Sequence, residues 1–131
     1  MGGGARLAAG FIRGEGLSPA NRAEMLRPQR SIVTSTQFGG EVLPPAQRRP
    51  DLSAGLGVIT FTGAQGPGFY KGGHNDTTAN TWVCLETSRR CVVILSNDVR
   101  SEKAFPALVR FILGDTGVPY DWEYGPETPG L

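Results

Sequence analysis

The sequence predicts an α+β fold: an antiparallel β-meander of about four strands, with short N-terminal helices and a C-terminal helix packed on the sheet. The main observation is that short β-branched and aromatic runs alternate with glycine-rich or charged turns after residue 56. A second is that apolar residues recur at helical spacing between residues 101 and 113. With 39% hydrophobic and 19% charged residues, the 131-residue chain is expected to form a single globular domain.

Residues 1–28 are predicted to form two short helices, and residues 29–55 an irregular segment. The first helix has apolar residues at helical spacing between positions 5 and 12, and glycines follow it. The second begins after Ser18, whose hydroxyl suits a helix N-cap, and ends before Pro28. Residues 29–55 are rich in proline and polar residues, which favours irregular structure, with Ser31-Ile32-Val33-Thr34 as a candidate short strand.

The sheet is expected within residues 56–98. Its four strand-like runs are 58–61, 68–71, 81–85 and 91–96. The last run is almost continuously apolar, which is typical of a strand covered on both faces. A helix over 99–114 follows, with one apolar face and Gly114 at its end. Residues 115–131 are expected to form an extended tail that either lies on the surface or packs through Trp122 and Tyr124.

Composition narrows the possible partners. Thirteen basic and twelve acidic side chains leave a net charge of +1, which predicts no nucleic-acid binding. No apolar run approaches the roughly 18 residues of a membrane span, and the first residues lack the apolar core of a secretory signal. The chain is expected to be soluble, and its compartment stays open.

The two cysteines, Cys84 and Cys91, lie in neighbouring strand-like runs. With a single histidine in the chain and no CxxC, they are too few for a zinc site. We expect two half-buried free thiols, and a cross-strand disulfide is the alternative.

The most informative stretch begins at residue 69 and contains Lys71-Gly72-Gly73. Asn97 follows Lys71 by 26 positions, at the end of the last strand-like run. Upstream, Gly55-Leu56-Gly57-Val58 leads into the first run. In order and spacing these motifs resemble the C-terminal portion of the serine β-lactamases, penicillin-binding DD-peptidases and related esterases, in particular the class C-like members. The resemblance implies part of a β-lactamase/transpeptidase-like fold.

In that family, Lys-Thr-Gly or a variant lies on the sheet strand at the edge of the active site. The resemblance implies a catalytic, electrostatic role for Lys71, and an oxyanion-hole role for the N–H of His74. It implies that Lys71, Gly72, Gly73 and His74 bind substrate, the glycines by allowing close approach to the backbone. No metal or other cofactor is implied. Lactamase-like members have a hydroxyl at the position of Gly72 that binds a substrate carboxylate, so Gly72 favours an esterase-like member.

Simpler interpretations exist for these residues. Lys71 could be a solvated lysine that discourages strand pairing, and His74 a turn histidine bonded to its own backbone. His74 and Asp76 alone are too few ligands for a metal site. The glycine-rich stretch 63–68 lacks a lysine directly after its last glycine, so it predicts a hairpin loop and not a phosphate-binding loop.

Neither of the family's other two motifs occurs. No serine lies three positions before Lys71 or Lys103, the only lysines, so the Ser-x-x-Lys nucleophile is missing, and Tyr-x-Asn or Ser-x-Asn is also missing. We therefore expect a C-terminal fragment of an acyl-serine hydrolase for an ester, β-lactam or peptide, inactive alone. Its expected partners are a small-molecule acyl substrate in the full-length family, and a complementing N-terminal fragment or a second copy. The alternative is a non-catalytic interaction module that uses an exposed sheet edge.

Overall fold

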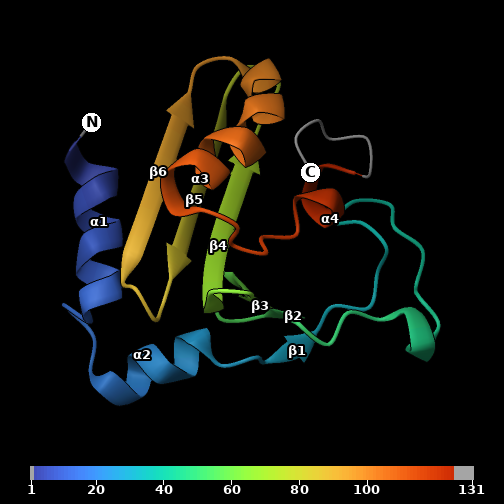
Figure 1. The fold of residues 1–131 in the computed structure, drawn as a ribbon, viewed down its shortest axis with the longest axis horizontal. Coiled ribbons are helices and arrows are strands. Elements are labelled where there is room, and N and C mark those ends of the chain that lie inside the picture. Colours follow the sequence, from blue (N-terminus) through green and yellow to red (C-terminus); the bar gives the residue numbers. More distant parts are fainter. Residues whose placement is uncertain (1, 126–131) are drawn as a thin grey trace.

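The computed structural model describes residues 2–125, which form a six-stranded antiparallel sheet with helices on both faces (Figure 1). The strands lie side by side in chain order: β1 Arg30–Ser31, β2 Leu52–Ala54, β3 Ile59–Gly63, β4 Gly66–His74, β5 Ala79–Leu85 and β6 Arg90–Ser96. The helices are α1 Gly2–Arg13, α2 Pro19–Leu26, α3 Phe105–Leu113 and α4 Tyr120–Tyr124, with 3-10 turns η1 Pro45–Gln47 and η2 Val99–Ala104. The predicted α+β class is confirmed.

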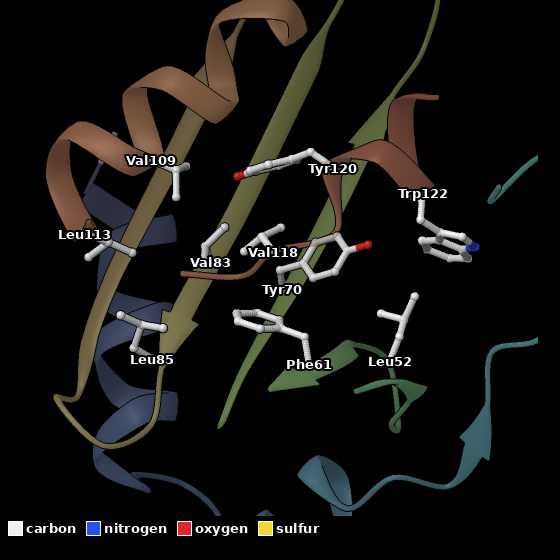
Figure 2. Packing of buried hydrophobic residues seen from close by; sticks show 10 residues of the cluster. All are labelled: Leu52, Phe61, Tyr70, Val83, Leu85, Val109, Leu113, Val118, Tyr120 and Trp122. Atoms are coloured by element: carbon white, nitrogen blue, oxygen red, sulfur yellow. The ribbon is translucent and has the colours of Figure 1, made fainter. Parts of the chain in front are cut away.

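The larger core lies between one face of the sheet and the helices α3 and α4. Val109 and Leu113 of α3 are buried because a spacing of four places both on the side that faces the strands. Figure 2 shows the cluster gathered between the sheet and α3, with Tyr120 and Trp122 contributed by α4. Its members are Leu52, Phe61, Tyr70, Val83, Leu85, Val109, Leu113, Val118, Tyr120 and Trp122.

The opposite face of the sheet is covered by α1 and α2. Side chains alternate along a strand, so Phe69 and Cys84 point to this face while their neighbours point to the other. Ile12 of α1 and Leu26 of α2 belong to the same cluster. The ring of Trp82 meets Phe69 edge to face, with 5.7 Å between the ring centres. Helix α1 runs beside β6 (Figure 1).

The sheet is larger than predicted: it has six strands where about four were expected. Both extra strands fall in residues 29–55, which were expected to be irregular apart from a candidate short strand at 31–34; β1 overlaps that candidate only at Ser31. Because β1 has two residues and β2 three, neither is long enough to show alternation, and pairing with a neighbour defines them. The predicted helix over 99–114 divides into η2 and α3.

The tail differs as well. It was predicted as extended over 115–131, yet residues 120–124 form α4; residues 126–131 lie outside the described part of the chain. Trp122 is buried in the core, which agrees with the packed alternative and not with a tail on the surface, and the indole Nε1–H donates to Thr34 at 3.3 Å. Across residues 2–125, no helix combines the length and apolar character that a membrane span requires.

Strand β6 is less covered than its apolar sequence suggested. Within residues 2–125 it pairs only with β5, and its side chains are mostly half-buried. Leu95, which points to the face that carries α1, is 62% exposed. The expectation of cover on both faces holds in part: α1 packs on one face of β6 and α3 on the other, but Arg90 and Leu95 remain exposed.

Cys84 and Cys91 form a disulfide, which corrects the expectation of two free thiols. They are directly opposite in the β5–β6 ladder, and their Cα atoms are 4.1 Å apart. Such closely spaced antiparallel pairs bring opposing side chains together. The sulfur of Cys84 is fully buried beneath α1, so the crosslink forms part of the packing on that face.

Candidate functional site

The predicted motif occupies the second half of β4, where that strand has only one neighbour. The β3–β4 ladder runs from Gly63↔Gly66 to Ile59↔Tyr70, and it pairs no residue of β4 beyond Tyr70. The β4–β5 ladder continues to His74↔Ala79. Within residues 2–125, no strand pairs with residues 71–74 on the side of β4 that faces β3, and this stretch is called the open edge.

The backbone polar groups of Gly72 and His74 point to this open edge. Alternate residues of an antiparallel strand direct their N–H and C=O to opposite neighbours. The carbonyl of Pro67 accepts from Glu86 beyond β5, so the odd-numbered residues of β4 face β5. The even-numbered ones face β3, or open space where β3 has ended. The N–H of His74 thus lies where a carbonyl oxygen from a bound molecule can approach it.

Lys71 projects from the face of the sheet that carries α1 and α2, opposite to α3. It is exposed, and its ammonium donates to the carbonyl of Gly72 at 2.7 Å. Within the described residues it forms no ion pair, so its charge is available to a ligand at the open edge.

His74 points to the other face and pairs with η2. Its Nδ1 lies 2.6 Å from Oε1 of Glu102, and the Phe38 ring centre is 6.4 Å from the imidazole centre. The interpretation of His74 as a turn histidine bonded to its own backbone is therefore wrong. A carboxylate partner of this kind holds an imidazole in one orientation. Asn75 instead organises the turn, since its Oδ1 accepts from the N–H groups of Thr77 and Thr78.

Gly72 faces a residue that the sequence did not suggest for the site, Glu123 of α4. A Cβ at Gly72 would clash with Oε1 of Glu123, so the carboxyl occupies the space of a side chain at this position. Gly73 is less constrained, because its nearest neighbour would be Asn80 Nδ2 at 3.3 Å. The glycine at position 72 thus has a specific cause, namely the close approach of Glu123.

Glu123 is buried without a full set of partners. It is 9% exposed, and its Oε2 has no hydrogen-bond partner within residues 2–125. The hydroxyls of Tyr70 and Tyr124 are also buried and have no hydrogen-bond partner among the described residues. Burial raises the pKa of Glu123 to about 7; the Lys71 ammonium acts to lower this pKa and the Glu102 carboxylate to raise it. A carboxyl of this kind is poised between its two protonation states near neutral pH.

Two adjoining cavities lie along the open edge. One of about 230 Å³ and another of about 150 Å³ are both lined by Gln37, Lys71, Gly72 and Glu123. The larger extends toward Gly55 and Gly57, and the smaller toward Phe38, Gly73, His74 and Tyr124. All four residues predicted from the motif therefore line the smaller cavity, and Glu123 lines it as well. The only hint of Glu123 in the sequence is a carboxylate between Trp122 and Tyr124, in a segment with no periodic pattern.

Asn97 follows β6 directly, 26 positions after Lys71. The chain matches no protein-family model, no curated protein and no solved structure.

Proposed function

We propose that this chain is the C-terminal portion of a β-lactamase-related serine hydrolase, and that it supplies one wall of an acyl-transfer site. The reaction in the full-length enzyme is acyl-serine hydrolysis of an ester, β-lactam or peptide, and the chain alone is inactive because it lacks Ser-x-x-Lys. The observation that best supports this proposal is the open edge at residues 71–74. It joins a lysine, two glycines and a free backbone N–H beside a cavity.

The arrangement suits stabilisation of an oxyanion. A tetrahedral intermediate develops negative charge on the former carbonyl oxygen, and a backbone N–H such as that of His74 can donate to it. Lys71 adds a positive charge at the same edge, on the face of the sheet opposite to α3. A second donor and the nucleophile would come from the missing part of the enzyme, close to this edge.

The remaining surface also favours a missing segment. By alternation, the backbone groups of Val93 and Leu95 on β6 face away from β5 and are available for another strand. Leu95 is 62% exposed, and Phe111 on the outer side of α3 is 89% exposed. Open strand edges are often covered by another element in complete proteins, so the edge of β6 could accept a further strand.

Complementation tests this proposal. The chain is mixed with an N-terminal segment of a related hydrolase that carries Ser-x-x-Lys, and hydrolysis of a chromogenic ester and a cephalosporin is followed. We expect activity only from the mixture, with a loss of at least about tenfold for Lys71→Ala. Lys103→Ala is the matched control, because Lys103 is exposed and lines neither of the two cavities. Failure of the two pieces to associate, or equal activity of both lysine variants, would refute the proposal.

The open edge of β6 also favours a second candidate, a non-catalytic module that binds a peptide or another copy of itself by strand addition. This function predicts binding of extended peptides by a stable monomer, or a dimer that dissociates on dilution. Light scattering over a dilution series, together with the complementation assay, separates these outcomes from the hydrolase.

A further inference from the structure

We propose that Glu123 makes the cavity beside Gly72 a subsite for a protonated amine, so that the site accepts acyl compounds bearing an ammonium group and disfavours those bearing a carboxylate. The inference rests on the proposed function for the acyl part of the ligand. The amine preference itself concerns binding and needs no catalysis.

The position of Glu123 is the first support. Its Oε1 lies where a side chain at position 72 would begin, directly beside the open edge of β4. A ligand lying along that edge, with its carbonyl at the N–H of His74, passes this carboxyl. Both cavities at the edge are lined by Glu123, so the ligand meets it in either one.

The unmet hydrogen-bonding capacity of Glu123 is the second support. The side chain is 9% exposed, and Oε2 has no partner within residues 2–125. A buried carboxylate without donors is costly, and an ammonium group supplies both the donors and the opposite charge. A bound carboxylate would instead place two like charges close together.

The competing influence is Lys71, which would attract a carboxylate. Its ammonium already donates to the carbonyl of Gly72, and the residue is exposed, so water screens its field. Glu123 is buried, where a charge is screened less. Among the described residues that line the two cavities, the other group able to carry positive charge is the His74 ring, whose Nδ1 is taken by Glu102. We therefore expect the influence of Glu123 to exceed that of Lys71.

The test uses three small esters that differ in charge and are otherwise alike: β-alanine ethyl ester, its N-acetylated form and monoethyl succinate. Binding to the whole chain is followed by NMR through the amide signals of Gly72, Gly73 and His74. The measurement is made at about pH 8, above the pKa of Glu123 of about 7. The amine ester is expected to bind at least about tenfold more tightly than monoethyl succinate, with the neutral ester between them.

Glu123→Gln is expected to bring the three affinities within about twofold of one another, whereas Glu41→Gln, which removes the same charge from an exposed site, should leave the preference intact. Lys71→Met provides a separate arm, because it should increase the preference for the amine. Equal or tighter binding of monoethyl succinate by the unmodified chain would overturn the proposal, as would an unchanged preference in a folded Glu123→Gln variant. If the mixture of the two pieces is active but the unmodified chain shows no preference for the amine ester, this inference alone is refuted. If the preference is found but the mixture is inactive, only the proposed function is refuted.

Discussion

Replacing Glu123 by glutamine is expected to remove a pH dependence from the stability of the fold. The carboxyl has an ordinary pKa of 4.5, and burial raises this pKa to about 7. Between these two values the folded protein retains a proton that the unfolded chain releases, so the free energy of unfolding falls as the pH rises. The loss is complete above about pH 7. It amounts to about 3 kcal/mol, because one pKa unit corresponds to about 1.4 kcal/mol.

The assay is urea unfolding followed by tryptophan fluorescence at about pH 5 and about pH 8, for the unmodified chain and for Glu123→Gln. Glutamine keeps the shape of the side chain but does not ionise, so any constant cost of burying its amide cancels when the two pH values are compared. Relative to the unmodified chain, the variant should gain up to about 3 kcal/mol on going to the higher pH. Glu41→Gln, at an exposed site, should behave like the unmodified chain. If Glu123→Gln and the unmodified chain lose stability in parallel, Glu123 does not ionise as the structure implies.

Three further changes test the packing. Gly72→Ala should lower the free energy of unfolding by about 1–3 kcal/mol through its clash with Glu123, and most of this cost should vanish in a Glu123→Ala background; equal costs in both backgrounds would contradict the contact. Leu113→Ala, at a position 2% exposed, should cost about 2–5 kcal/mol in urea unfolding, and Leu108→Ala, at 43% exposed, less than about 1 kcal/mol; the reverse order would place the wrong face of α3 on the sheet. Reducing the disulfide, which joins residues 7 positions apart, should lower stability by about 2 kcal/mol, and a chain that shows no such loss would not depend on the crosslink.

The predictable part of the fold was the part with local patterns. Strands β3 to β6 carry enough β-branched and aromatic residues to be recognised, and α3 shows its apolar face in nine residues. By contrast, β1, β2 and α4 have two, three and five residues, too few for a period to appear. Their structure depends on partners elsewhere in the chain. The hydrogen bond from Trp122 to Thr34, 88 positions apart, is one contact that ties α4 in place.

Only the part of the candidate site that lies on β4 could be predicted from the sequence. The motif at residues 71–74 is contiguous, so it could be found by inspection, and the structure places it at an open strand edge. Glu123 enters from 51 positions beyond Gly72, and a glycine reveals that something must come close without revealing what. The bonding of His74 to Glu102 was also hidden, since it depends on how η2 folds back over β4.

The order of the strands has a consequence for how the chain folds. Because every strand pairs with its neighbour in sequence, most of the sheet forms through short-range encounters, and proteins dominated by such contacts fold quickly. The packing of α1 on β6 and the contact of α4 with Thr34 are exceptions, since each joins segments that are far apart in the sequence. We expect the hairpins to form first and α1 to dock late. Before α1 docks, the face of the sheet that it covers would be exposed to solvent. Cys84 and Cys91 would then be accessible to an oxidant, and the disulfide could form before α1 covers it.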